Sequence, residues 1–362
     1  MREDTTTLFT VGPVEMDPAI FEPLGYKLPY FRTEEFSQMM LRSCDLIKEF
    51  ARTKEDSAAI FLTASGTGAM EAAIGNVFSS KDKVLIINGG TFGERFEMIC
   101  QTLQIPYSSI LLPPGKALVR EDLEPFRDRG YTGLLINAHE TSTGVYYNLP
   151  TIGEFCKEEG LLFIVDAISS FMADPFYMDE WNIDIAIISS QKALAVSPGI
   201  SILIVNKQTT DRICKQQVCS LYFNLKQYLE DSKRGQTPFT PAVGVLLQLS
   251  KRLEQIKKVG LETVIQHTQS LAEDFREKIK DLPLVIESES LSNALTPLSS
   301  ANGKDAYEIF QHLKNRYHLI VNPNGGLLKN RLFRVGHIGK LSFSDNQRLI
   351  DALHNMKKEG LL

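Results

Sequence analysis

The segment Ile183-Asp184-Ile185-Ala186-Ile187-Ile188-Ser189-Ser190-Gln191-Lys192 is the most informative part of this chain. Its apolar part is typical of a buried strand, and Lys192 follows the end of that strand. Burial disfavours the charged form of a lysine, which lowers its pKa and makes the amine a usable nucleophile, as in Schiff-base enzymes. The alternative is a solvated lysine just past the strand, which is the commoner case for a lone lysine.

Composition narrows the class of protein. The chain has 362 residues, which suits two domains better than one. A formal net charge of −5 gives no electrostatic footprint for nucleic acid, and no apolar stretch approaches the roughly 20 residues that span a bilayer. We therefore expect neither nucleic acid nor membrane as a partner.

Cysteine usage and the N-terminus bear on the compartment. The five cysteines are scattered and none forms a Cys-x-x-Cys pair, so neither a zinc site nor a disulfide framework is expected. The polar start, Met1-Arg2-Glu3-Asp4-Thr5, does not resemble a signal peptide. Both features favour a reduced, cytoplasmic location.

Strand and helix patterns alternate from about residue 58 to residue 206. The expected strands are Ala58–Thr63, Val84–Asn88, Gly133–Ala138, Leu161–Asp166, Ile183–Ser189 and Ile200–Val205, and amphipathic helices are expected at Gly68–Phe78, Gly93–Leu103 and Thr151–Glu159. This alternation predicts an α/β fold, in which a mostly parallel sheet carries helices on both faces. Ligands bind such sheets beyond the carboxyl ends of the strands.

The pattern changes after a long helical stretch at residues 242–281, which Val259-Gly260 is expected to break. Strands are then expected at Leu284–Glu287, Leu319–Asn322 and Leu332–Val335, and helices at Asp305–Tyr317 and Ser344–Lys358, with Ser344 as an N-cap. We predict a large domain over residues 1–255 and a smaller α+β domain over residues 256–362. The segment 1–20 is expected to pack near the site and the small domain.

The first motif with chemistry is Ala64-Ser65-Gly66-Thr67-Gly68-Ala69-Met70-Glu71. It follows a strand and opens a helix, so its small residues let a ligand approach amides at the positive end of the helix dipole. This predicts a phosphate site. A tight strand–helix turn that needs glycine for shape alone is an equally good interpretation of this motif by itself.

The second motif is Asp166 at the end of Leu161–Val165. An acid that ends an apolar strand is poorly solvated unless it meets a cation, and a protonated pyridine nitrogen would be such a partner. An N-cap or a metal ligand are the alternatives. No His or Cys cluster lies nearby in the sequence, so no metal is expected.

Residues that could contact a bound ligand follow two further strands. The hydroxyl-rich segment His139-Glu140-Thr141-Ser142-Thr143-Gly144 could orient a ligand oxygen, or form a solvated turn. In Asn88-Gly89-Gly90-Thr91-Phe92-Gly93-Glu94-Arg95, Phe92 lies between glycines and could stack on a flat ligand, or pack under the next helix. A phosphorylated, flat, nitrogen-containing cofactor that bonds a lysine fits the whole set, which points to pyridoxal 5′-phosphate (PLP).

These motifs together resemble the class V aminotransferases, in the branch of alanine–glyoxylate, serine–glyoxylate and 2-aminoethylphosphonate–pyruvate transaminases. The resemblance covers nearly the whole chain. It rests on Thr10-Val11-Gly12-Pro13-Val14, Arg32-Thr33-Glu34-Glu35-Phe36, Ser65-Gly66-Thr67-Gly68-Ala69-Met70-Glu71-Ala72-Ala73, His139-Glu140-Thr141-Ser142-Thr143-Gly144, Val165-Asp166, Ser190-Gln191-Lys192-Ala193-Leu194 and Phe333-Arg334-Val335-Gly336-His337-Ile338-Gly339.

The resemblance implies the PLP-dependent fold of type I and a role for each matching residue. Lys192 would bond the cofactor aldehyde and carry the proton, Asp166 would hold the pyridine nitrogen protonated, and Phe92 would stack on the ring. Thr141 would meet the ring hydroxyl. The phosphate would be held by Thr67, Gly68, Ala69 and Gln191, together with Thr240 from the neighbouring subunit of a homodimer.

On the substrate side, the resemblance implies that Arg334 clamps the α-carboxylate as a bidentate pair, with Gly12 also at the substrate. The expected reaction is ping-pong transfer of an amino group from alanine, serine or aspartate to glyoxylate or pyruvate. Two positions depart from the family pattern. Phe31 stands where many relatives have His, which puts the substrate preference in doubt, and Ser189 stands where some have Gly.

Other functions stay open from the sequence. A 2-aminoethylphosphonate transaminase needs an extra cation, for which Arg32 and Lys340 are candidates. A cysteine desulfurase needs a reactive cysteine in the C-terminal third, whereas the last cysteine here is Cys219. A non-catalytic PLP-fold protein and a plain phosphate-binding α/β protein are the remaining alternatives.

Overall fold

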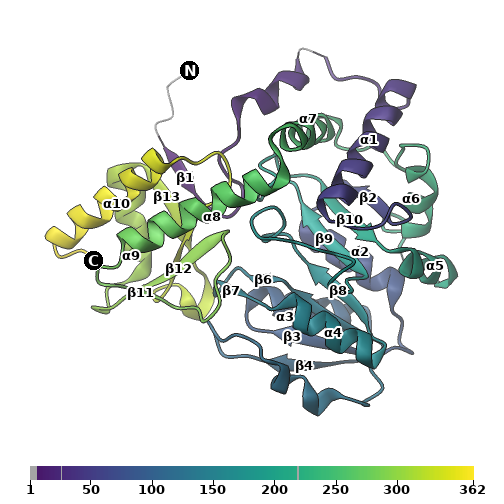
Figure 1. Cartoon of the computed structure of the whole chain (residues 1–362), viewed down its shortest axis with the longest axis horizontal. Coiled ribbons are helices and arrows are strands. Elements are labelled where there is room, and N and C mark those ends of the chain that lie inside the picture. Colours follow the sequence, from purple (N-terminus) through teal and green to yellow (C-terminus); the bar gives the residue numbers. More distant parts are fainter. Residues whose placement is uncertain (1–5, 26, 218–219) are drawn as a thin grey trace.

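The computed structural model of the chain describes residues 6–25, 27–217 and 220–362 (Figure 1). Met1–Thr5, on which the expectation of a polar start rests, and Cys219, the last cysteine of the sequence, lie outside the described residues. Two sheets of different size organise the molecule. Within the described chain no helix is long and apolar enough to cross a membrane.

The larger sheet has seven strands in the order β2-β10-β9-β8-β5-β3-β4. They are β2 (Ala58–Leu62), β3 (Val84–Asn88), β4 (Tyr107–Leu111), β5 (Gly133–Asn137), β8 (Leu162–Asp166), β9 (Ile185–Ser189) and β10 (Ser201–Val205). Only β10 runs antiparallel to its neighbours among these strands. The predicted α/β fold with a mostly parallel sheet is confirmed.

Strand register brings the candidate motifs to one edge of this sheet. Asn137 at the end of β5 pairs with Asp166 at the end of β8, and Ser189 at the end of β9 pairs with Ser201 at the start of β10. Because β10 is antiparallel to both β9 and β2, the carboxyl end of β2 lies at the same edge. The turns that follow these strands therefore meet in space.

Helices cover both faces because side chains alternate along each strand. In β3, Leu85 and Ile87 face the core under α1 (Glu34–Phe50), α4 (Leu149–Glu159) and α7 (Val243–Val259). Val84 and Ile86 face the core under α2 (Gly66–Val77), α3 (Thr91–Thr102), α5 (Lys207–Lys215) and α6 (Leu225–Ser232). Burial on both faces explains why these strands are almost continuously apolar.

The smaller sheet has the order β1-β13-β14-β12-β11. Its strands are β1 (Thr7–Phe9), β11 (Leu284–Ile286), β12 (Leu295–Ser300), β13 (Leu319–Pro323) and β14 (Phe333–Gly336), and it packs with α8 (Leu261–Lys278), α9 (Ala306–Tyr317) and α10 (Phe343–Lys358). Strand β1 brings the N-terminal segment to β13. Gly260, at φ +98°, separates α7 from α8 as expected. The domain division after residue 255 stays a prediction.

Short elements complete the chain. They are the hairpin β6 (His139–Glu140) and β7 (Val145–Tyr146), and the 3₁₀ helices η1 (Pro18–Leu24), η2 (Arg120–Asp122), η3 (Glu124–Phe126) and η4 (Gly326–Leu328).

Two details of the sequence-based assignment were wrong or incomplete. Ser344 does not cap α10. Ser342 does, because its hydroxyl accepts from the amide of Asp345 while that carboxylate accepts from the amide of Ser342, which forms a capping box. Strands β4 and β12 were absent from the expected set. The first is a half-exposed edge strand, and the second contains Pro297, so neither has a clear apolar pattern.

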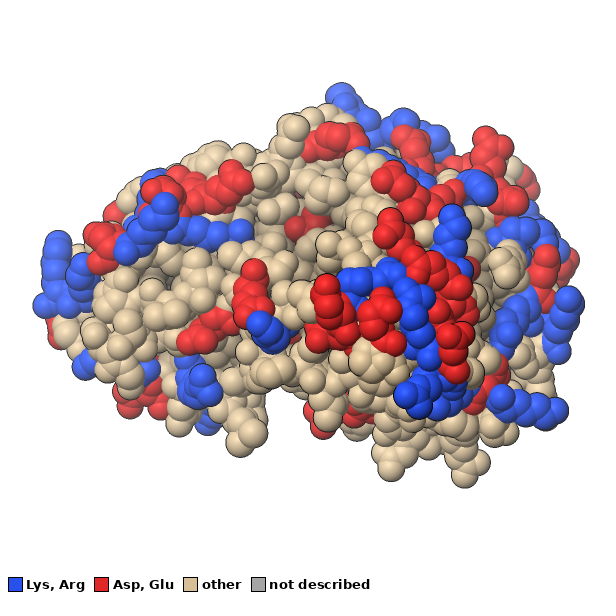
Figure 2. All heavy atoms as spheres, turned by 60° about the horizontal axis from the view of Figure 1, so that its bottom comes forward, with Lys and Arg blue, Asp and Glu red and all other residues tan. Residues whose placement is uncertain are grey.

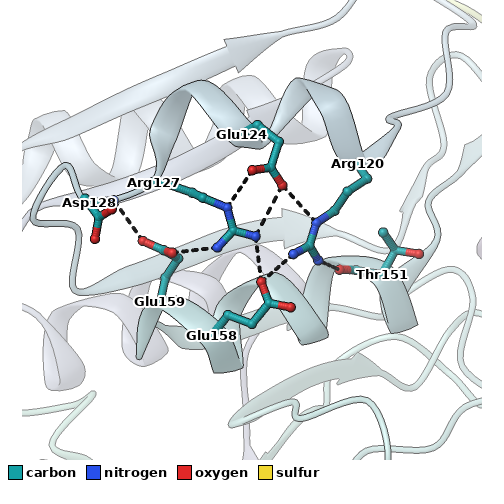
Figure 3. A network of polar contacts seen from close by, with 7 residues as sticks. All are labelled: Arg120, Glu124, Arg127, Asp128, Thr151, Glu158 and Glu159. Atoms are coloured by element: carbon teal, nitrogen blue, oxygen red, sulfur yellow. Dashed lines mark hydrogen bonds and ion pairs between the residues drawn. The ribbon is translucent and has the colours of Figure 1, made fainter.

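A surface ion network ties the connection after β4 to α4. Figure 2 shows basic and acidic side chains gathered side by side on one face of the molecule, and Figure 3 shows the network itself. Arg127 contacts Glu124, Glu158 and Glu159 at 2.6, 2.6 and 2.8 Å. Arg120 also pairs with Glu124 and Glu158. These hydrogen bonds from arginine hold the pKa values of Glu124 and Glu158 below their usual range.

We expect Arg127→Met to lower the Tm by about 1–2 °C more than Arg129→Met, an exposed neighbour outside the network. Because the folded-state pKa values of Glu124 and Glu158 are lowered, the stabilisation is present above about pH 4.3 and is lost as the pH falls further. Thermal unfolding at several pH values and salt concentrations checks this. If the difference in Tm between the two variants does not shrink in acid or in 1 M salt, the ion network does not provide the stabilisation.

Candidate active site

A cavity of about 200 Å³ lies at the carboxyl edge of the large sheet. It is lined by Ser65, Gly66, Thr67, Phe92, Arg95, His139, Thr141, Asp166, Ile168, Ser169, Gln191 and Lys192. The turns after β2, β3, β5, β8 and β9 all contribute. Six residues proposed from the sequence therefore meet here: Thr67, Phe92, Thr141, Asp166, Gln191 and Lys192. A larger depression of about 1300 Å³ lies elsewhere, around Asp184 and Asn206 at the opposite ends of β9 and β10.

Lys192 and Asp166 form the charged centre of the cavity. Burial lowers the pKa of Lys192 to about 8, although the charge of Asp166 opposes that shift. Burial also raises the pKa of Asp166 to about 6, although the amide of Ile168 donates to its Oδ1 at 2.8 Å. A partly buried amine with a larger neutral fraction than an exposed lysine thus lies near a buried acid that is mostly ionised at pH 7.

Gly12 packs directly on the lysine. A Cβ at Gly12 would lie 2.7 Å from Cδ of Lys192 and 3.0 Å from the carbonyl oxygen of Gln191. The φ of Gly12 is +136°, which also favours glycine. The N-terminal segment thereby closes against the aliphatic stem of Lys192.

The turn before α2 has the features of an anion site. Ser65 is the N-cap and its hydroxyl accepts from the amide of Gly68 at 3.4 Å. Gly66 and Thr67 line the cavity at the positive end of the helix dipole. A Cβ at Gly66 would lie 2.3 Å from Cδ1 of Ile168, so a larger residue there would have to displace that side chain.

The two remaining residues of the predicted phosphate turn lie deeper in α2. Gly68 and Ala69 are not among the residues that line the cavity. The amide of Gly68 donates to Ser65, and the amide of Ala69 donates to the carbonyl oxygen of Ser65 at 3.2 Å. Thr67 and Gln191 therefore have the more direct access to a ligand.

Glu140 fixes the aromatic side of the cavity. Its fully buried carboxylate accepts from the amides of Phe92 and Gly93 at 3.2 and 3.1 Å, from the amide of Ser142 at 3.1 Å and from Nδ2 of Asn137 at 3.0 Å. The N-cap of α3 is Gly90, which has no side chain to cap the helix. Glu140 therefore caps α3 from another loop and sets the position of Phe92.

Hydroxyl groups connect three of the lining residues. The Oγ of Ser169 lies 2.8 Å from Oγ1 of Thr141 and 3.1 Å from Nδ1 of His139. Arg334 holds the same loop from β14, because its Nη1 donates to the carbonyl oxygen of Thr141 at 2.9 Å while Nη2 donates to that of Pro323 at 2.6 Å. Arg334 is buried beside the cavity but does not line it, and its Nε has no partner within the described chain.

Other candidates lie outside the cavity. Thr240 is exposed, Lys340 pairs with Asp17 at 2.6 Å, and Phe31 packs under the guanidinium of Arg32. Arg32 donates to Gln236 and to the carbonyl oxygens of Thr237 and Pro238, so it holds the segment before Thr240. Ser189 hydrogen-bonds Ser201 at 3.0 Å between β9 and β10.

Several lining residues had no assigned role in the sequence analysis. Arg95 lies one turn after Phe92 and places its guanidinium 4.8 Å from that ring, a spacing that a helical pattern could have indicated. Arg95 forms no ion pair in residues 6–25, 27–217 and 220–362. Ile168 and Ser169 follow Asp166 without a motif of their own. No group of three or more His, Cys, Asp or Glu in these same ranges could hold a metal ion.

Comparison with known proteins assigns the family. The model of the class V aminotransferases matches residues 30–316, which is most of the chain. The chain belongs to the class V aminotransferase family. Residues 30–316 include every strand of the large sheet and the whole cavity lining.

Three relatives illustrate how far the similarity of this aminotransferase extends. It is 31% identical to the small subunit of a soluble hydrogenase from Synechococcus, over 99% of this chain and 94% of that protein. It is 26% identical to L-aspartate–glyoxylate aminotransferase of Paracoccus denitrificans, over 92% of this chain and 87% of the relative. The crystal structure of alanine–glyoxylate aminotransferase from Nostoc superposes with a TM-score of 0.91 at 26% identity and covers 97% of this chain and 95% of the other.

The protein is a PLP-dependent transaminase, and the residues of its cavity fit that cofactor. The cradle at Gly66 and the dipole of α2 suit a phosphate, Asp166 suits a ring nitrogen, and Lys192 suits an aldehyde. When bound, PLP supplies an aldehyde that bonds amines and a ring that withdraws electrons from the bonded carbon.

We expect Glu140→Ala to lower the free energy of unfolding by about 3 kcal/mol, because several buried donors lose their acceptor. Urea denaturation measures this, with Glu94→Ala as the matched control, since Glu94 is an exposed acid in the first turn of the same helix. Equal stability of the two variants would contradict the role of Glu140.

We expect Lys192 of the cofactor-free protein to react with acetic anhydride with a midpoint near pH 8, where exposed lysines titrate near 10.4. Peptide mass spectrometry after short pulses at increasing pH gives the midpoint. A value near 10 for Lys192 would show that burial does not shift its pKa.

Proposed function

We propose that this transaminase moves an amino group from alanine, serine or aspartate to glyoxylate or pyruvate by a ping-pong mechanism. The observation that carries the proposal is one cavity in which the partly buried amine of Lys192 lies near the buried carboxylate of Asp166. The Paracoccus and Nostoc relatives act on aspartate or alanine with glyoxylate by name, which supports small substrates of this kind.

We assign the central chemical roles to Lys192 and Asp166. Lys192 would bond the cofactor aldehyde and would carry the proton at the substrate α-carbon. Its lowered pKa provides the neutral amine that both tasks need. Asp166 holds the ring nitrogen protonated, and pairing with that cation offsets the burial that raises the pKa of the free carboxyl.

The remaining cofactor contacts hold the ring and the phosphate in place. Phe92 stacks on the ring and Thr141 meets its hydroxyl. The start of α2 binds the phosphate through Thr67, Gly68, Ala69 and Gln191, where Gly68 and Ala69 contribute by shaping the turn. In this arrangement the protein orients the cofactor, and its burial excludes water.

Arg334 and Gly12 are assigned to the substrate. Arg334 has an unpartnered buried Nε within the described chain, so it retains donor capacity for a carboxylate. Gly12 leaves room above the stem of Lys192. Arg95 adds a cation to the cavity wall, and this favours 2-aminoethylphosphonate as a second candidate donor.

We further propose a cytoplasmic homodimer with its sites at the subunit interface. Thr240 is exposed and away from its own cavity, as expected for a residue that serves the neighbouring subunit. Leu221 and Tyr222 expose apolar surface near it, and Tyr222 stacks on Phe239 at 5.3 Å. The cysteines within the described chain are unpaired, which favours a reducing compartment.

The donor is tested by visible absorption of the yellow holoprotein mixed with single compounds. The panel is alanine, serine, aspartate, glutamate and 2-aminoethylphosphonate. We expect bleaching by alanine, serine or aspartate, and recovery on adding glyoxylate or pyruvate. Bleaching by 2-aminoethylphosphonate alone would establish the second candidate, and no bleaching by any donor would contradict the proposed reaction.

Arg334→Lys tests the carboxylate clamp in the same assay. We expect at least a tenfold higher donor concentration for half-maximal bleaching, because a lysine cannot form the bidentate pair. The cofactor should stay bound. An unchanged half-maximal concentration for every donor refutes the role of Arg334.

A further inference from the structure

His139 is a cavity-lining residue to which the mechanism above gives no task. It is buried, with 2% of its surface exposed, and it lines the cavity at the end of the turn after β5. Its Nδ1 lies 3.1 Å from Oγ of Ser169. Its Nε2 is buried and has no hydrogen-bond partner within the described chain. A buried ring nitrogen without a partner is costly unless a ligand supplies one.

The hydroxyl groups around His139 fix which nitrogen is left over. Ser169 Oγ lies within reach of Nδ1 of His139, of Oγ1 of Thr141 at 2.8 Å and of the carbonyl oxygen of His139 at 3.4 Å. With Thr141 donating to Ser169 at 2.8 Å, the hydroxyl of Ser169 can donate to Nδ1 of His139 at 3.1 Å. The proton of the imidazole then lies on Nε2, which becomes a donor.

The imidazole is neutral in this environment. Burial lowers the pKa of His139 to about 3, and the positive charges of Lys192, Arg334 and Arg276 contribute to that shift. Those cations come from the turn after β9, from β14 and from α8, while Arg95 on α3, Asp166 after β8 and Glu140 on β6 complete the charged groups of this region. His139 therefore offers one N–H at Nε2 without adding positive charge.

The polar groups of PLP limit which of its atoms can accept a hydrogen bond from Nε2 of His139. PLP has a phosphate, an aldehyde, a ring nitrogen and a ring oxygen. The start of α2 accounts for the phosphate, Lys192 for the aldehyde and Asp166 for the nitrogen. The ring oxygen is left with Thr141 alone, and Ser169 joins Thr141 to His139.

We propose that His139 is a second binding residue for the cofactor and donates its Nε2–H to the oxygen on the pyridine ring. The inference rests on the PLP-dependent function. No proton is transferred in this contact. It holds the ring in place and stabilises the ionised oxygen, so it affects both cofactor affinity and the pH at which the bound cofactor changes colour.

Two substitutions separate hydrogen bonding from packing. His139→Phe keeps a ring of similar size but has no donor, whereas His139→Gln keeps an amide N–H on a side chain long enough to replace Nε2. The readouts are the dissociation constant of PLP, from equilibrium dialysis of cofactor-free protein, and the pH midpoint of the visible absorption of the holoprotein. Thermal unfolding of the cofactor-free variants shows that each is folded.

We expect His139→Phe to bind PLP about tenfold more weakly and to move the pH midpoint upward, because loss of a donor favours the protonated chromophore. His139→Gln should bind PLP nearly as tightly as the unmodified protein and should have a pH midpoint close to its value. An unchanged affinity and midpoint in His139→Phe would overturn the proposal, and so would equal impairment of the two variants. Failure of the unmodified protein to bind PLP would instead overturn the proposed function itself.

Discussion

The buried carboxylate of Glu140 is the interaction on which the site depends. It accepts hydrogen bonds from the start of α3 and from its own loop, so it joins the turns after β3 and β5. A charge buried to this extent is tolerable only because its donors are complete. Phe92 thereby receives a defined position over the cavity, and Arg334 extends the same framework to the small sheet through Thr141. The two sheets are thus coupled beside the cavity.

Burial then determines the chemistry of the cavity. The same desolvation moves the pKa values of Lys192 and Asp166 toward each other. Such a pair is costly in an empty cavity and favourable when a ligand brings a cation to the carboxylate and an aldehyde to the amine. Paired groups with shifted pKa values are typical of functional sites, and here they lie within the residues that the class V aminotransferase model matches.

Local sequence patterns were sufficient for the strands and for the residues directly at their ends. Asp166 was predictable because an apolar run leads straight into it, and Lys192 because it follows the end of such a run by a short polar turn. The contact of Glu140 with Phe92 joins residues 48 positions apart and depends on how two loops meet, which no local pattern contains. Ser342 caps α10 because the carboxylate of Asp345 accepts a hydrogen bond from its amide in return, although Ser344 lies nearer to the polar start of the helix. Thr240 is exposed and does not line its own cavity, so its proposed contact with the phosphate requires a second subunit.

The central claim is that the cavity at the carboxyl edge of the large sheet binds PLP through Lys192. The most direct measurement is peptide mapping of the holoprotein after borohydride reduction, which fixes the cofactor covalently on the amine that holds it. We predict a single pyridoxyl group on the peptide that contains Lys192. A pyridoxyl group on another lysine, or an unmodified Lys192 in fully loaded protein, would contradict it.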